Sequence, residues 1–185
     1  TRARYAYDAY GNLTATYNDG DVSVTGDEVS TLTTFNLNPS AWILNTASLV
    51  QTYDAVGALV AQARFYYDGA TSIQTVPVKG VVTREEKWLN VPSEQWIGSR
   101  LAYDAYGNVT VLTDALGRSV TNTYDAAGTY VTRMDNALGF RQTFVHDPRN
   151  GQTLRATDPN TVTSATLYDA LGRRISVRNG TNTTY

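Results

Sequence analysis

Tyr103-Asp104-Ala105-Tyr106-Gly107-Asn108 repeats, residue for residue, the hexapeptide that begins at Tyr7. From Leu101 onward its core, Asp-x-x-Gly, returns about every eleven residues, with aspartate spacings of 10, 11, 10, 12, 11 and 11 residues. A fixed short period determines the architecture before any local motif does. The copies after residue 100 are Tyr103-Asp104 to Gly107, Asp114 to Gly117, Tyr124-Asp125 to Gly128, Asp135 to Gly139, Asp147 to Gly151, Asp158 and Tyr168-Asp169 to Gly172.

Each copy has the composition of a chain reversal. Asp at the first position and Gly at the fourth are the residues that a type I β-turn favours. The carboxylate can accept hydrogen bonds from backbone N–H groups just ahead of it, and glycine adopts the left-handed conformation without a Cβ penalty. Pro148 and Pro159 directly follow their aspartates, where proline pre-sets φ. The six or seven residues between turns therefore form a strand of about 20–23 Å.

The first hundred residues carry the same motif more loosely. Copies occur at Tyr7-Asp8 to Gly11 and Tyr53-Asp54 to Gly57, with a truncated copy at Tyr67-Asp68-Gly69. We expect one continuous repeat array, with degenerate repeats and strand-rich insertions over 1–100 and regular repeats over 101–185. The segments between copies with strand character are 22–24, 30–35, 42–44 and 59–67, followed by 81–89 and 95–104, which a Pro-containing hairpin loop at 90–94 joins.

The residue before each aspartate alternates between a large ring and a smaller or flexible side chain. The rings are Tyr103, Tyr124, His146 and Tyr168, and Thr113, Met134 and Thr157 lie between them. The full repeat is therefore 21–22 residues and two turns, as in an antiparallel meander whose successive turns lie on opposite edges. We expect the rings to form a ladder along one edge, with residues such as Thr121 and Thr143 between them, because next-but-one strands lie about 9.6 Å apart.

The fold class is thus all-β, an antiparallel meander of hairpins forming a curved ribbon. No window has the apolar spacing of an amphipathic helix, and Thr, Val and Tyr favour strands. One face should be rich in Tyr, Val and Leu, and the other in Thr, Arg and Asn. A parallel β-helix is the alternative architecture, although strict two-way alternation of edges is not its signature. The chain starts at Thr1 without Met and stops inside another repeat, so we expect a fragment of a longer polypeptide.

Composition excludes several function classes. A net charge of −2 gives no basic face for nucleic acid, and no apolar run approaches the 18–20 residues of a membrane span. With no cysteine there is neither a disulfide framework nor a Cys-ligated metal site. A single histidine, His146, excludes a multi-histidine metal cluster. The acidic cluster of Asp19, Asp21, Asp27 and Glu28 lacks the spacing of a calcium loop, so we interpret it mainly as a solvated loop.

Candidate catalytic groups are scarce. All seven acidic residues of 101–185 are aspartates of the repeat, so turn formation accounts for each of them. Glu85 and Glu86 are adjacent on an expected strand and would point to opposite faces. We therefore assign no catalytic, cofactor-binding or metal residue and no cofactor, and expect no enzyme. The remaining candidates are Trp42, Trp88 and Trp96, which could stack on sugars if the chain were a cell-surface adhesion module that binds glycans.

The recurrence of Tyr-Asp-Ala-Tyr-Gly-Asn, Thr-Asp-Ala-Leu-Gly-Arg and Tyr-Asp-Ala-Leu-Gly-Arg at this period resembles the Rhs/YD-repeat family. The match spans 5–17, 53–73 and nearly all of 95–180. The resemblance implies a β-ribbon that spirals into a shell around a toxin or effector domain of the same secreted or cell-surface bacterial polypeptide. It implies partners in the flanking repeats and the enclosed cargo. The family's self-cleaving aspartyl site has no match here, because Asp147-Pro148 and Asp158-Pro159 lack its surrounding sequence.

Overall fold

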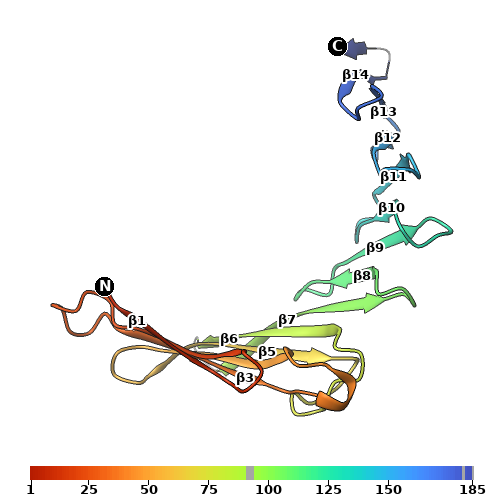
Figure 1. Ribbon diagram of the computed structural model, residues 1–185. Helices are drawn as coiled ribbons and strands as arrows, with labels where there is room; N and C mark the ends of the chain where they lie inside the picture. The colour runs from red at the N-terminus through yellow and green to blue at the C-terminus, as the bar shows by residue number, and fades with distance from the viewer. Residues whose placement is uncertain (91–93, 181, 185) are drawn as a thin grey trace. The chain divides into compact units, whose positions relative to one another are not determined.

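A computed structural model describes residues 1–90, 94–180 and 182–184 of the chain (Figure 1). The chain divides into two compact units, Thr1–Leu101 and Ala102–Tyr185. Strand β7 (Glu94–Tyr103) begins in the first unit and ends in the second. Each unit is described below by itself.

The first unit contains the longer strands. They are β1 (Ala3–Tyr7), β2 (Leu13–Asn18), β3 (Val29–Phe35), β4 (Ala47–Tyr53), β5 (Leu59–Tyr67) and β6 (Val82–Asn90), followed by most of β7. A single turn of 3-10 helix, η1 (Pro39–Ala41), interrupts them. It is the one helix in the described part of the chain, and no described helix is long and apolar enough to cross a membrane.

The second unit contains shorter strands of more even length. They are β8 (Val109–Thr113), β9 (Ser119–Tyr124), β10 (Val131–Asp135), β11 (Arg141–His146), β12 (Thr153–Thr157), β13 (Thr163–Tyr168), β14 (Arg174–Asn179) and β15 (Asn182–Thr184). Each strand begins just after one repeat turn and ends just before the next. The eleven-residue period therefore corresponds to one strand and one turn.

The strand order is the order of the chain, and the pairing is antiparallel at each registered pair. The sheet is open. This confirms the prediction of an all-β antiparallel meander, and the parallel β-helix is wrong for this chain. Register shifts at several strand ends, for example between Val145 and His146, mark β-bulges beside the turns.

Within each unit the described strands contact their chain neighbours alone, so no second layer of strands or helices covers either sheet face. In the second unit the register separates the side chains. Leu112 lies beside Val120 on one face, which also carries Tyr124, Met134, Phe144 and His146. The other face carries Thr113, Ser119, Arg133, Asp135, Arg141, Thr157 and Thr163. There, hydroxyl pairs at 2.9 Å join Thr113 to Ser119 and Thr157 to Thr163.

The first unit has a small buried cluster at one strand edge. The long segment after Asp68 folds back, and its Pro77 is fully buried. The Asp68 carboxylate accepts hydrogen bonds from the backbone N–H groups of residues 78, 79, 80 and 81. Asn38 donates from Nδ2 to the carbonyl of Pro77 at 2.8 Å. Beside it, Tyr67 is buried and donates its hydroxyl to the carbonyl of Ala47 at 2.8 Å.

Two expected strands are wrong. Residues 22–24 lie in a turn, where the N–H of Val24 donates to the carbonyl of Asp21, because Gly20 and Gly26 on either side take left-handed φ values. Residues 42–44 follow η1, and Trp42 adopts a φ of 57°, so that only an isolated bridge joins Ile43 to Asn38. The other expected strands correspond to β3, β5, β6 and β7. The central residues of the predicted loop at 90–94, 91–93, lie outside the described residues.

The two edges of the second unit differ in how closely successive turns approach. On the edge of the Tyr and His rings, Gly128, Gly151 and Gly172 each lie under a side chain from the preceding turn on that edge. A Cβ placed at Gly128 would lie 2.7 Å from Cδ2 of Tyr106, and one at Gly151 would lie 2.8 Å from Cε1 of Tyr130. On the opposite edge, a Cβ at Gly117 or Gly139 would have no neighbour within 4 Å.

This asymmetry gives a mutational test. Gly128 and Gly117 have φ values of 68° and 78°, so Gly128→Ala and Gly117→Ala should each cost about 1–2 kcal/mol for the left-handed conformation. Only Gly128→Ala also displaces Tyr106, so chemical denaturation should show the larger loss. In the Tyr106→Ala background the two losses should become equal. Equal losses in the wild-type background would contradict the turn-to-turn contact.

Candidate functional site

The repeat turn is the candidate site, and most copies share one hydrogen-bond pattern. In the copy that begins at Asp104, Oδ1 accepts from the N–H of Tyr106 and of Asn108, both at 2.9 Å. The N–H of Gly107 donates to the carbonyl of Asp104 at 3.2 Å, and the N–H of Asp104 donates to the carbonyl of Asn108 at 3.0 Å. The same carboxylate bonds to the N–H groups two and four residues ahead occur at Asp8, Asp54, Asp114, Asp158 and Asp169.

Two copies form turns that are one residue longer. The N–H of Asp125 donates to the carbonyl of Tyr130, and that of Asp147 to the carbonyl of Gln152. Asp125 accepts from the N–H of Thr129 at 2.7 Å. Asp147 is buried and accepts from the N–H of Arg149 at 2.9 Å. Its four-residue spacing to Gly151 therefore reflects a longer loop, in which the N–H of Gly151 reaches the carbonyl of Asp147 at 2.8 Å.

The assignment of Asp135 as a turn aspartate is wrong. Its spacing to Gly139 is four residues, whereas Asn136 lies three residues before the glycine. The Asn136 Oδ1 accepts from the N–H of Leu138 and of Phe140, at 2.9 and 3.0 Å, which is the role that aspartate has elsewhere. Asp135 is the last residue of β10, and its carboxylate binds Arg133 and Arg141 instead. An asparagine side chain supplies the same acceptor oxygen as aspartate.

Among the turn carboxylates, Asp114, Asp147 and Asp169 have a pKa below the ordinary range. The Arg149 guanidinium, which donates to both Asp147 oxygens at 2.9 and 2.6 Å, lowers the pKa of that carboxyl to about 2, with help from the Arg149 N–H. The Arg118 side chain and N–H lower the pKa of Asp114. The Arg173 N–H, followed by its guanidinium, lowers the pKa of Asp169. These carboxylates are therefore anionic turn anchors across the physiological range.

The ring residues that precede the aspartates reach back to the previous hairpin. Tyr124 donates its hydroxyl to the carbonyl of Val109, and Tyr168 donates to that of Thr153, both at 3.2 Å. His146 lies with Nε2 2.9 Å from the carbonyl of Val131. In each case the carbonyl belongs to the residue fifteen positions earlier, so a histidine serves where tyrosine serves in the other copies. Tyr103 is half-buried, and Tyr7 is 61% exposed.

The residues expected between the rings are different ones. The registers place Thr121 beside Asp135 and Thr143 beside Arg133, on the face opposite Tyr124 and His146. Side chains alternate between the two faces along a strand, and Thr121 lies three positions before Tyr124, so the two point to opposite faces. The rings that approach His146 are Tyr130, with centroids 5.3 Å apart, and Phe144, with centroids 6.2 Å apart.

Amide side chains also link successive turns on the same edge. Asn108 donates from Nδ2 to the carbonyl of Gly128 at 2.7 Å, twenty residues ahead. Gln152 donates from Nε2 to the carbonyl of Gly172 at 2.6 Å. In the first unit, Asn12 donates to the carbonyl of Leu44 at 2.6 Å. The identity of the two hexapeptides was the available signal for Asn12 and Asn108, whereas no sequence signal indicated Gln152.

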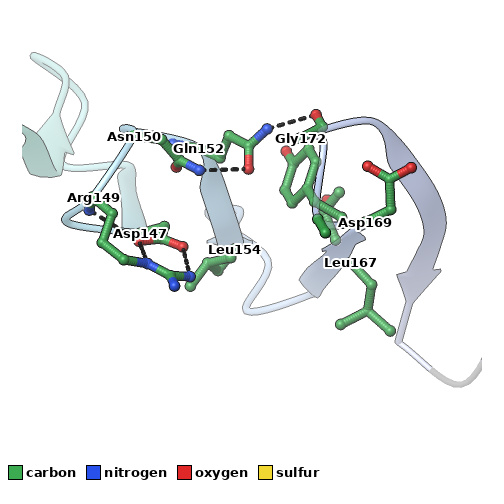
Figure 2. Close-up of a pocket in the computed structure, with 11 residues that line it drawn as sticks. Asp147, Arg149, Asn150, Gln152, Leu154, Leu167, Asp169 and Gly172 are labelled. Atoms are coloured by element: carbon green, nitrogen blue, oxygen red, sulfur yellow. Dashed lines mark hydrogen bonds and ion pairs between the residues drawn. The ribbon is translucent and has the colours of Figure 1, made fainter.

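A cavity of about 510 Å³ lies between the turns at 147–152 and 168–172 (Figure 2). Arg149 closes onto Asp147 on one side, and Asn150 donates to the Oε1 of Gln152 on another. The Gln152 amide in turn binds the carbonyl of Gly172. Because these polar groups already have partners, the cavity is a gap between joined turns rather than a set of free ligands.

The three tryptophans do not form one surface. Trp88 and Trp96 are directly opposed on β6 and β7, whereas Trp42 lies at the end of η1 and is 83% exposed. The Arg64 guanidinium carbon lies 3.6 Å from the centre of the Trp96 ring and covers one face of it. Glu85 and Glu86 point to opposite faces as expected: Glu85 pairs with Lys87, and Glu86 accepts from the Tyr66 hydroxyl at 2.7 Å.

The acidic cluster of the first unit is internally satisfied. Asp19 binds Arg2 and Arg4, Asp21 accepts from Ser23, and Glu28 accepts from the N–H of Gly26. Across the described ranges, no three His, Cys, Asp or Glu side chains gather in a way that could hold a metal ion.

The corrected turn assignment can be tested directly. Asn136→Ala leaves two turn N–H groups without their acceptor and should cost about 1–2 kcal/mol of unfolding free energy in a denaturant titration. Asp135→Ala removes surface ion pairs with Arg133 and Arg141, which contribute little, and should therefore cost clearly less than Asn136→Ala. A larger loss for Asp135→Ala than for Asn136→Ala would restore the original assignment.

The pH dependence follows from the lowered pKa values. A carboxyl whose folded pKa lies below the unfolded value of 3.8 contributes stability that is complete above about pH 4 and is lost as the pH falls toward 2. A carboxyl-carbon NMR titration should therefore give Asp147 a midpoint near 2. Arg149→Gln should move the midpoint toward 3.8, whereas Arg174→Gln should leave it unchanged. A wild-type midpoint near 3.8 would contradict the ion pair.

Comparison with known proteins identifies the repeat. Residues 103–142 match the family model of the RHS Repeat. No curated protein sequence matches the chain. Among solved structures, that of TcdB2-TccC3 matches with a TM-score of 0.67 and 13% identity, covering 94% of this chain and 11% of that one. TcdB2-TccC3 without its hypervariable C-terminal region matches with a TM-score of 0.54 and 15% identity, covering 96% and 10%.

This chain thus spans about a tenth of the length of the solved structures that it matches. At such low identity the likeness establishes the fold alone. The resemblance to the Rhs/YD-repeat family is confirmed: residues 103–142 carry the RHS repeat, and nearly the whole chain shares its fold with TcdB2-TccC3.

Proposed function

We propose that the chain is a structural module, a section of the wall of a larger β-shell, with no catalytic role of its own. Its partners would be the flanking repeats and a toxin or effector domain enclosed by the same secreted bacterial polypeptide. The observation that carries this proposal is that the described strands of each unit have no second layer of strands or helices against them. A sheet needs its apolar face covered, and here the cover would come from elsewhere in the polypeptide.

Burial supports the need for such a cover. Among the described residues, the buried apolar side chains are Ala15, Tyr66, Tyr67 and Pro77. Many large apolar side chains are exposed instead, including Leu112 at 43%, Phe140 at 55% and Ile175 at 52%. Contiguous exposed apolar surface marks an interaction site in soluble proteins.

The chemistry of the turns supports a structural role over a catalytic one. The turn carboxylates accept two or more hydrogen bonds each, from backbone N–H groups or arginines, as at Asp104 and Asp147. At Asp147 both oxygens bind the Arg149 side chain and the pKa is lowered to about 2, far from the near-neutral pKa that suits a general base. The fold shared with TcdB2-TccC3 supports the role in a shell, and the name of the second matched structure records a hypervariable C-terminal region in that protein.

The need for a cover can be tested with a hydrophobic dye. The isolated 185-residue chain should enhance the fluorescence of anilinonaphthalene sulfonate strongly or associate with itself in sedimentation analysis. The complete polypeptide should bind less dye per repeat, because its flanks cover the same surface. A monomeric isolated chain that binds no dye would count against the wall module.

Encapsulation is tested separately in the complete polypeptide. Limited proteolysis should cut the downstream domain slowly there and quickly when that domain is expressed alone. Gly128→Ala, which separates two contacting turns, should increase the cleavage rate more than Gly117→Ala. If the downstream domain is cut at the same rate in both forms, the chain does not belong to an enclosing shell, whatever the dye result.

A further inference from the structure

A second cavity, of about 460 Å³, lies beside the strands β12, β13 and β14. The register aligns Arg155 of β12 with Ala165 of β13, and Ala165 with Arg178 of β14. The two arginines therefore project from the same sheet face on either side of an alanine. Their Cα atoms are separated by two strand spacings, about 9.6 Å. The small Ala165 side chain leaves the space between them open.

The charge on these two arginines is uncompensated. Five other arginines of the second unit pair with aspartates: Arg118 with Asp114, Arg133 and Arg141 with Asp135, Arg149 with Asp147, and Arg173 with Asp169. In the described part of the chain, neither Arg155 nor Arg178 has a carboxylate within ion-pair distance. Both line the cavity, and both are exposed.

The rim of the same cavity holds an unfavourable backbone conformation. Thr161 occupies the fourth position of its turn, where the other Asp-x-x-Gly copies have glycine, and its φ is 65°. A β-branched residue in the left-handed region is a true outlier, and such strain gathers at functional sites. Among the described residues, the Thr161 hydroxyl has no hydrogen-bond partner, whereas that of Thr163 is paired with Thr157. Thr161 therefore offers a free hydroxyl at a cost in stability.

We propose that Arg155, Arg178 and Thr161 form a binding site for a tetrahedral oxyanion, the phosphate or sulfate group of a small ester. Guanidinium groups present planar forks of N–H donors that match such oxygens, and a hydroxyl supplies a further donor. Val162 and Ala165 also line the cavity, which gives the rest of the ester an apolar surface. The site is independent of the proposed wall function.

The first test is binding by the whole chain at constant ionic strength. Inorganic phosphate and phenyl phosphate are titrated separately while amide shifts are followed by NMR, with chloride as the reference salt. Saturable shifts at Thr161 and Arg178 are expected for at least one probe. Tighter binding of phenyl phosphate identifies an ester as the ligand, and equal affinity identifies the free anion. No saturable shift with either probe overturns the proposal.

Matched variants distinguish binding at this site from non-specific attraction of anions to surface arginines. Arg155→Gln and Arg178→Gln should each weaken binding about tenfold, as expected for loss of a charged hydrogen-bonding partner. Arg174→Gln removes the same charge from β14 at a residue that does not line the cavity, and should leave the affinity unchanged. If Arg174→Gln weakens binding as much as the other two, the attraction is diffuse and the site does not exist.

Variants of Thr161 test whether its unfavourable backbone conformation serves anion binding. Thr161→Gly should raise the thermal midpoint, since glycine takes φ of 65° freely, and should weaken anion binding several-fold. Thr161→Ser keeps the hydroxyl and should preserve affinity. A Thr161→Gly variant that is more stable and binds the anion equally well would exclude Thr161 from the site.

Discussion

The acceptance of backbone N–H groups by a turn carboxylate is the interaction on which the rest of the structure depends. Strands β8 to β14 are only five or six residues long, and no described strand or helix packs on their faces to hold them in place. The position of each strand follows from the two turns that bound it. At Asp104 one oxygen satisfies two N–H groups that the turn itself leaves without an acceptor. The turns therefore fix the register that a hydrophobic core would fix in a layered domain.

Turns alone would leave neighbouring hairpins free to twist against one another, and the edge contacts restrict this motion. Asn108 and Gln152 bind carbonyls of the next turn on their edge, and Tyr124, His146 and Tyr168 reach back to the preceding hairpin. On the opposite edge Gly117 and Gly139 have open space around the Cα atom. One edge is thus cross-linked by side chains, and the other depends on backbone pairing.

Periodicity predicted the fold class, the antiparallel pairing and the alternation of edges, because all three follow from the spacing of one motif. Periodicity failed at Asp135. The turn position was assigned to this aspartate because aspartate fills it in the other copies, but Asn136 has the correct spacing to Gly139. The prediction also failed at Val22–Val24, where apolar content suggested a strand but the flanking glycines set a turn. The contacts between turns could not be predicted from the sequence. The partner of Gln152 is set by which turns lie next to each other along the sheet edge, and the repeat spacing does not show which side chain bridges them.

The same-edge links carry a consequence for how such arrays change in length. The link from Asn108 to Gly128 joins one turn to the next turn on the same edge, two turns further along the chain. The turns on each edge therefore form their own series, in which each turn carries the residues that fit its neighbours on that edge. Loss of a single strand and turn would bring residues of one series onto the other edge and leave Asn108 opposite an unsuited turn. Loss or gain of two strands together would preserve both series. We therefore expect duplications and deletions to be tolerated when they add or remove an even number of strands. The unit by which such an array lengthens or shortens is then a pair of strands with their two turns, about 22 residues.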